Sequence, residues 1–129
     1  MNKTVESLIK ALKDEKWYIR REAAKALGRM KSKQAIKPLA ELLKDEDNDV
    51  AGAAAKALGM IGDKQAVDPL IKALKDSRLY IRYCATKALG MIREKCAVGP
   101  LIKMLNDKEE LVRQAAAEAL RQIVGRDFG

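Results

Sequence analysis

Hydrophobic and polar positions alternate along this chain with the spacing of α-helices. In residues 35–44 the apolar positions are Ile36, Leu39, Ala40 and Leu43, and in residues 48–61 they are Val50, Ala54, Ala57, Leu58 and Ile61. Apolar residues three and four positions apart lie on one face of a helix. The pattern therefore predicts an amphipathic helix over each range. No stretch shows the two-residue alternation of β-branched side chains that is typical of a strand.

This pair of helices recurs along the chain with a period of 31 residues. Pro38, Pro69 and Pro100 are 31 positions apart. The same interval relates Leu27, Leu58, Leu89 and Leu120; Ile19, Val50, Ile81 and Val112; and Asp14, Asp45, Asp76 and Asp107. One such unit cannot bury its apolar stripe alone, whereas stacked units bury it between them. We therefore expect one all-α domain over residues 1–129, an α-solenoid of four two-helix repeats at about 4–31, 32–62, 63–93 and 94–124, whose first pair covers residues 5–13 and 17–30.

Small and capping residues indicate how these helices begin and pack. Ser32 and Asp63 precede first helices of their units and are candidate N-caps. Acidic residues 45–47 precede a second helix, where the helix dipole favours negative charge. Gly28, Gly59 and Gly90 recur inside second helices, where a glycine costs up to about 1 kcal/mol relative to alanine. Their recurrence predicts that neighbouring helices approach closely there.

Composition excludes several kinds of chemistry. The 129 residues include 26 Lys and Arg and 18 Asp and Glu, for a net charge of +8, but no histidine, two cysteines and five aromatic residues. Without histidine there is no ordinary protease triad, no imidazole metal ligand and no imidazole acid or base. Two cysteines build neither a disulfide framework nor a four-cysteine zinc site. No apolar run is long enough to span a membrane. We expect a cytoplasmic protein without a catalytic residue, a metal or a cofactor.

Two other groups of residues have simpler explanations than a site. Asp45, Asp47 and Asp49 have the spacing of a calcium loop, but Val50 and Lys56 stand where such a loop needs Gly and Glu. They are expected to form a turn and a helix cap. Cys84 lies three positions before Lys87, whose charge would lower the pKa of the thiol. Because no histidine can serve as its base, Cys84 is expected to be a free structural thiol.

A second stripe of the second helices differs from the core stripe because it varies between repeats. Positions 19, 23, 26, 27 and 30 form the core stripe, and positions 18, 21, 22, 25 and 29 form the variable one. Variation between repeats along one row is what a binding surface would show, because packing between the repeats does not dictate the side chains of this row. The candidate partner-binding residues are Trp17, Tyr18, Arg21, Lys25, Arg29, Lys56, Tyr80, Tyr83 and Lys87. Aromatic residues and arginine are enriched at interface hot spots. The alternative is that the tyrosines lie at a solvated helix edge and the lysines only aid solubility.

The repeat motif resembles a known family. Residues 19–28 (IRREAAKALG) and 66–74 (AVDPLIKAL) resemble the short HEAT-like repeats of the phycobiliprotein-lyase type. The resemblance implies an α-solenoid whose second helices line the concave face, with a ladder of turn aspartates and helix arginines. Ala51 replaces the arginine found at Arg20, Arg82 and Arg113, so the ladder is expected to be interrupted at Asp45 or a neighbour. Some relatives assist chromophore attachment, and others are di-iron hydroxylases that use histidine, which this chain lacks.

Several functions remain open at this stage. We expect a non-enzymatic scaffold that binds a protein partner, acidic in character, on the concave face. The charge of +8 also permits nucleic-acid binding, although lysines on both helices of the repeat weaken the argument for one basic groove. A lyase or chaperone subunit rests on the resemblance alone. Ile123 continues a core row with no later helix to cover it, so either residues 126–128 fold back or a second copy docks there as a homodimer.

Overall fold

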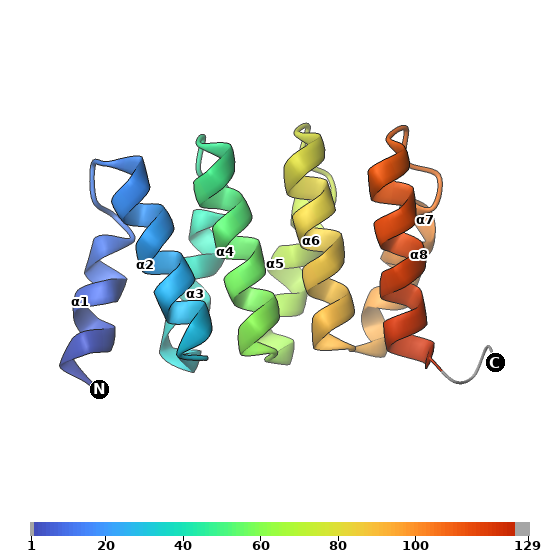
Figure 1. Ribbon diagram of the computed structural model, residues 1–129. Coiled ribbons are helices and arrows are strands. Elements are labelled where there is room, and N and C mark those ends of the chain that lie inside the picture. The colour runs from blue at the N-terminus through green and yellow to red at the C-terminus, as the bar shows by residue number, and fades with distance from the viewer. Residues whose placement is uncertain (1, 126–129) are drawn as a thin grey trace.

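A computed structural model describes residues 2–125, which form two layers of helices (Figure 1). The first layer holds α1 (Lys3–Ala11), α3 (Ile36–Leu42), α5 (Val67–Ala73) and α7 (Val98–Met104). The second layer holds α2 (Trp17–Arg29), α4 (Asn48–Ile61), α6 (Leu79–Ile92) and α8 (Glu110–Val124). Short 3₁₀ turns precede α3, α5 and α7: η1 (Lys33–Ala35), η2 (Lys64–Ala66) and η3 (Lys95–Ala97). The described part contains no strand, and the predicted all-α solenoid is confirmed.

The second-layer helices pack side by side along the molecule, α2 on α4, α4 on α6 and α6 on α8. A Cβ atom added to Gly28 would lie 2.8 Å from Cα of Ala57, and one added to Gly59 would lie 3.0 Å from Cα of Ala88. The same contact recurs between Gly90 and Ala119, at 2.9 Å. The predicted packing constraint is therefore present at each of these helix pairs, and only glycine allows this separation.

The first layer is looser. Each first-layer helix packs mainly against the second-layer helix of its own repeat. A groove of about 600 Å³ lies between α3 and α5, with Lys37 and Lys72 among its lining residues. In a curved solenoid, the layer with the more closely spaced helices is expected on the concave side. The second layer is therefore the surface on which a partner would meet the most helices.

The core runs between the two layers through every repeat. Its largest fully buried side chains are Ile81 and six leucines: Leu27, Leu39, Leu58, Leu70, Leu89 and Leu101. Met30 was expected to continue the core row of Ile61 and Ile92, and this expectation is wrong because its side chain is 43% exposed. The reason is that α2 ends at Arg29, so Met30 is its C-cap and lies beyond the last packed turn.

The last described repeat lacks a neighbour on one side. Leu105 is 38% exposed, whereas Leu43 and Leu74 at the same position of earlier repeats are 4% and 5% exposed. Ile123 is half-buried and packs on the core. Arg121 occupies the position of the close-approach glycines, so another helix could not approach α8 at the same separation. Residues 126–128, expected to fold back, lie outside the described part of the chain.

Buried and half-buried arginines join each repeat to the next. Arg20 donates from Nε to Oδ2 of Asp45 at 2.9 Å and from Nη1 to the backbone oxygen of Asp14 at 2.8 Å. Arg82 repeats both contacts, with the Asp107 carboxylate at 2.9 Å and the Asp76 backbone oxygen at 3.0 Å. One guanidinium thus ties the turn of its own repeat to the turn aspartate of the following repeat. Such charge-assisted hydrogen bonds are stronger than neutral ones.

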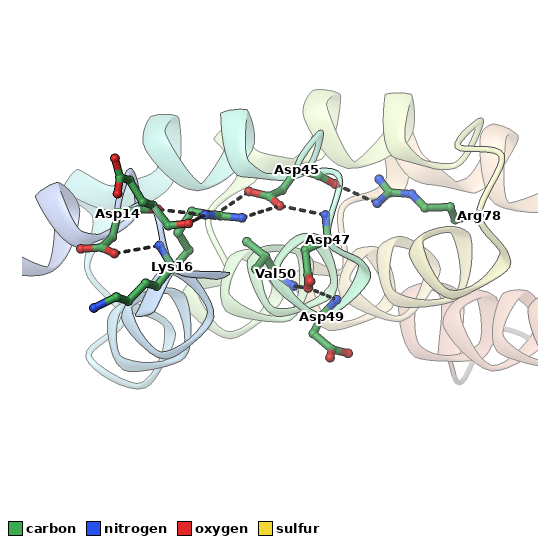
Figure 2. A network of polar contacts seen from close by, with 9 residues as sticks. Asp14, Lys16, Asp45, Asp47, Asp49, Val50 and Arg78 are labelled. Carbon is green, nitrogen blue, oxygen red and sulfur yellow. Dashed lines mark hydrogen bonds and ion pairs between the residues drawn. The ribbon is translucent and has the colours of Figure 1, made fainter. Parts of the chain in front are cut away.

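The interruption expected at Asp45 or a neighbour does not fall on Asp45, which keeps its arginine, Arg20. The aspartate that loses its partner through Ala51 is Asp76, and Arg78 takes over the contact. Arg78 donates from Nε and Nη2 to the Asp76 carboxylate at 2.9 and 3.0 Å, and from Nη1 to the backbone oxygen of Asp45 at 2.8 Å. Figure 2 shows Arg78 reaching Asp45 from the side opposite Asp14. Arg78 thus makes the two kinds of contact that Arg20 and Arg82 make, but it does so from the third repeat instead of the second.

Ionisation of Asp76 and Asp107 is favoured by their arginines. Hydrogen bonds from Arg78 lower the pKa of Asp76 below its ordinary value. Burial raises the pKa of Asp107, but hydrogen bonds from Arg82 and from the backbone outweigh it, so that this pKa is also lowered. The carboxylates therefore remain charged throughout the neutral range and hold their arginines.

The expected turn and cap residues are only partly confirmed. Asp47 accepts hydrogen bonds from the backbone of Asp49 and Val50 at 2.9 and 3.1 Å, and Asp45 accepts one from the backbone of Asp47 at 2.9 Å (Figure 2). Asp63 caps η2 through the backbone of Gln65 at 2.8 Å. Ser32 makes no such bond, because its hydroxyl donates to the Gln34 side chain instead. Residues 2–125 contain no group of three or more acidic or cysteine side chains placed to hold a metal ion.

We predict opposite effects of the same substitution at two glycines. Gly28→Ala should destabilise the fold by about 2 kcal/mol, because the new methyl group meets the backbone of Ala57 and overpacking outweighs the gain in helix propensity. Gly99→Ala is the matched control, since nothing lies within 4 Å of its added Cβ and Lys37 and Asp68 already occupy that position in other repeats. It should stabilise the protein by about 0.5 kcal/mol. Urea denaturation measures both, and equal effects would contradict the packing constraint.

We also predict that Arg78 and position 51 are coupled. Arg78→Ala should cost about 1–3 kcal/mol, because the Asp76 carboxylate loses its charged donor. Adding Ala51→Arg to this variant should restore most of the loss, whereas Ala51→Arg in the otherwise unchanged protein should destabilise it, because two guanidinium groups would compete for one place. A double-mutant cycle by urea denaturation tests the coupling. Additive effects of the two changes would show that Arg78 does not replace the missing arginine.

Candidate binding face of the second layer

The nine candidate residues lie on the outward side of α2, α4 and α6, a surface that we call the second-layer face. Trp17, Tyr18 and Tyr80 are 41%, 47% and 45% exposed, which is high for aromatic side chains. Lys25, Arg29, Lys56 and Lys87 are exposed, and Arg21 and Tyr83 are half-buried. The structure does not gather these residues at one point. It divides them into two clusters that are separated by α4.

The first cluster lies at the start of α2. The rings of Trp17 and Tyr18 meet edge to face at 6.0 Å between centroids, and the Arg21 guanidinium lies 4.9 Å from the Trp17 ring centre. Arg21 also donates to Glu22 at 2.9 Å, and this hydrogen bond lowers the pKa of Glu22. Lys25 lies 3.8 Å from the same carboxylate. Glu22 therefore offsets part of the positive charge at this end of the face.

Tyr18 has a second environment that its sequence position did not reveal. It lines a hollow at the N-terminal end of the molecule together with Leu8, Ala11 and Ile19. In α6 the equivalent residue is Tyr80, which packs against α4, the previous helix of the second layer. Because α2 is the first described helix of the second layer, no second-layer helix lies against Tyr18 in the way that α4 lies against Tyr80. Tyr18 belongs to the edge of the second-layer face.

The second cluster is built on α6. The Tyr80 ring lies directly against Gly52 of α4, where its nearest carbon leaves no space for a Cβ atom. Lys87 lies 3.5 Å from the Tyr83 hydroxyl and 5.2 Å from the centre of its ring. Charge on the neighbouring Cys84 and partial burial raise the pKa of Tyr80. Gly52 was not expected to belong to the site. Its signal in the sequence is that it is the only glycine in the variable row.

Between the clusters the face is cationic. Lys25, Lys56 and Lys87 contribute one ammonium group from each of three successive helices, and α2 adds Arg29. A shallow groove of about 90 Å³ between α2 and α4 is lined by Lys25, Arg29, Lys56 and Met60 among others. Within residues 2–125, neither Arg29, Lys56 nor Lys87 has a carboxylate oxygen within 4.0 Å. These charges are consequently available to an external anion.

No candidate residue was expected on α8, but this helix contributes to the face. Leu111 is 59% exposed, the largest value among the exposed large hydrophobic residues of the described chain. It lines a groove of about 270 Å³ between α6 and α8, together with Tyr83, Lys87 and Met91. The sequence signal for Leu111 is that an apolar residue stands at the position of the repeat that Tyr18 and Tyr80 occupy in other repeats. Leu111 is aliphatic, so a criterion based on aromatic side chains does not include it.

Lys87 acts on Cys84 in the expected direction, but the pKa of this thiol is raised overall. Burial of the thiol raises this pKa above its ordinary value. Tyr80, Lys87 and Lys56 act in the opposite direction but do not overcome burial. Cys84 is a free thiol, as is the exposed Cys96. A raised pKa reduces the thiolate fraction at neutral pH, and with it the reactivity of Cys84.

The architecture defines a tandem helical-repeat solenoid, and comparison with known proteins identifies its kind. Residues 5–83 and 37–121 match the family model of HEAT repeats. The chain therefore belongs to the HEAT-repeat family, which confirms the resemblance that the sequence motifs indicated. No curated protein matches the sequence. No helix in the described part is both long and apolar enough to cross a bilayer.

Solved structures place the fold among several repeat proteins. Human deoxyhypusine hydroxylase is 28% identical with a TM-score of 0.83, over 92% of this chain and 43% of that one. The complex of CpcE and CpcF of phycocyanin lyase from a Nostoc species is 22% identical with a TM-score of 0.70, over 96% and 66%. A designed armadillo repeat protein in complex with the peptide (KR)4 is 22% identical with a TM-score of 0.67, over 92% and 64%. The chain spans less than two thirds of each.

We predict that the two cysteines differ in reactivity. At pH 7.5 Cys96 should be alkylated by iodoacetamide about ten-fold faster than Cys84, because Cys84 is partly buried and has a raised pKa. Mass spectrometry of the digested protein after timed reaction measures both rates. In urea the two rates should become similar, which controls for local sequence. Faster reaction at Cys84 in the folded protein would contradict the effect of burial.

Proposed function

We propose that the protein is a non-enzymatic binding scaffold whose second-layer face binds a protein partner with acidic side chains. The observation that carries this proposal is the combination of exposed aromatic rings with unpaired cationic groups on one closely packed layer. Trp17 and Tyr80 are more than 40% exposed, although the core has no need of an aromatic residue. Tyrosine, tryptophan and arginine supply most of the binding free energy at many interfaces.

The two kinds of side chain would contribute differently. Burial of Tyr80 and Tyr83 under a partner would provide affinity, because aromatic rings remove a large apolar area from water. Lys25, Lys56 and Lys87 would attract acidic surfaces, speed association and disfavour cationic partners. Because the helices beneath are joined by glycine contacts and arginine bridges, little conformational entropy would be lost on binding.

The comparisons support this use of the fold. HEAT repeats cover most of the chain, and one structural neighbour is a designed armadillo repeat protein in complex with the peptide (KR)4. Another neighbour is a complex of two lyase subunits. Both cases involve protein ligands of a helical-repeat solenoid. The second-layer face described above is cationic, and we infer that its preference is for acidic ligands.

Nucleic acid is the less favoured ligand. Lysines line the groove between α3 and α5 as well as the second-layer face, and a nucleic-acid groove is expected to concentrate positive charge on one side. Docking of a second copy at the last repeat stays a prediction. Exposed Leu105 favours it, whereas Arg121 at the glycine position disfavours the separation found between the described repeats. A cytoplasmic location likewise stays a prediction.

The proposal predicts that the aromatic cluster is needed to capture a partner. Tyr80→Ala with Tyr83→Ala should reduce recovery of the bound protein by about five-fold or more, measured by quantitative mass spectrometry of nuclease-treated pull-downs. Lys72→Ala with Lys75→Ala, on the first layer, is the control and should leave recovery unchanged. Circular dichroism melting verifies that both variants are folded. Equal recovery by the wild type and the tyrosine variant would refute the site, and a ligand removed by nuclease would favour nucleic acid.

A further inference from the structure

The second-layer face offers three positions between neighbouring helices, and they differ in character. Between α2 and α4 the groove holds about 90 Å³ and is lined by three cationic side chains, Lys25, Arg29 and Lys56. Between α4 and α6 the Tyr80 ring lies against Gly52, where it occupies the space that a side chain at position 52 would need. Between α6 and α8 the groove opens to about 270 Å³. Since the backbone repeats, side chains alone create this difference.

The groove between α6 and α8 is suited to an apolar side chain. Tyr83 and Met91 approach from α6, and Leu111 and Ala115 from α8. Lys87, Gln114, Glu118 and Gln122 add polar groups to the lining. Met91 is 43% exposed and Leu111 is 59% exposed, so both would lose apolar area to water when covered. A cavity of about 150 Å³ already admits benzene in a protein interior. A groove of about 270 Å³ therefore has room for one leucine, methionine or phenylalanine side chain.

Charge around this groove is asymmetric. Lys87 stands on its α6 side, and Lys56 and Lys25 follow on the two helices beyond. On the α8 side, Glu118 lines the groove and pairs with Arg121 at 2.7 Å. A ligand with its apolar side chain in the groove would extend over the row of lysines in one direction. Acidic side chains are the groups that such a row would favour.

The spacing of the helices sets the spacing of these groups. Packed helices lie about 8–10 Å apart, and an extended peptide advances about 3.3 Å per residue. One repeat therefore corresponds to about three residues of an extended ligand that crosses the helices. An acidic side chain over Lys87 would lie close to the apolar residue in sequence. A second one, over Lys56, would lie about three residues further along.

We propose that the α6–α8 groove is the anchoring pocket for one bulky apolar side chain of an extended acidic segment, whose carboxylates pair with Lys87 and Lys56. This inference rests on the proposed function, since it specifies the partner of the same face. It adds a pocket, contributed partly by α8, and a sequence pattern that the ligand must carry. The pattern is a leucine, methionine or phenylalanine with two acidic residues on one side, about three residues apart.

A displayed library of random 12-residue peptides tests the proposal without knowledge of the natural partner. Selection on the intact protein should enrich peptides with the apolar residue and the acidic spacing. One enriched peptide, labelled with fluorescein, is then titrated and followed by fluorescence polarisation. Leu111→Ser should weaken its binding about five-fold or more, as should replacement of the peptide's apolar residue by serine. Ile102→Ser is the matched control, since Ile102 is 51% exposed on the first layer, and should leave binding unchanged.

The outcomes separate this inference from the proposed function. If enriched peptides lose affinity in Lys56→Gln and Lys87→Gln variants but not in Leu111→Ser, the pocket is refuted while the face stands. If the selected peptides are basic, or bind equally well when both lysines are replaced, the acidic ligand is refuted. If no peptide is enriched and oligonucleotides bind at physiological salt instead, both the inference and the proposed function fail. Loss of affinity in Leu111→Ser alongside an unchanged Ile102→Ser supports the pocket.

Discussion

The close approach of successive second-layer helices is the constraint on which the rest of the structure depends. At Gly28, Gly59 and Gly90 the backbone of one helix meets an alanine of the next without room for a side chain. This contact sets the separation of the helices, and the separation decides which side chains can share a groove. A looser layer would leave Tyr80 without the surface of Gly52 beneath it. The same contact leaves the first layer more widely spaced, with the lysine-lined groove between α3 and α5.

Arginine bridges and glycine contacts act at opposite ends of α2 and α6. Arg20 and Arg82 lie in the first turns of α2 and α6, whereas Gly28 and Gly90 lie near their ends. A helix held at two distant points cannot easily pivot against its neighbour. The candidate face is consequently a row of fixed helices whose outward side chains are free to differ. This division of tasks explains why the core rows repeat every 31 residues while the variable row does not.

The fold could be predicted because its determinants are local and periodic. The bounds of α4 follow from its apolar spacing, and the glycine row indicated tight packing before any contact was known. The features that could not be predicted depend on contacts between side chains of different repeats. Nothing in the sequence near Ala51 reveals that Arg78 fills its place. The raised pKa of Cys84 reflects burial beside Tyr80, which outweighs the lysine that its sequence position suggested. The α6–α8 groove is lined by side chains of two successive repeats, so no single repeat contains the information.

The position of Arg78 has a consequence for how the copies can be rearranged. Most repeats contain their own arginine at the position of Arg20 and Arg82. Such a repeat could be moved within the array and its arginine could still bind the turn aspartate of the repeat that follows. The second and third units are different, because one lacks the arginine and the other supplies it. They form an indivisible pair, and exchanging either one with another copy would leave a turn with two guanidinium groups or with none. The natural module for recombination at this point in the array is therefore 62 residues long, twice the 31-residue interval of the sequence.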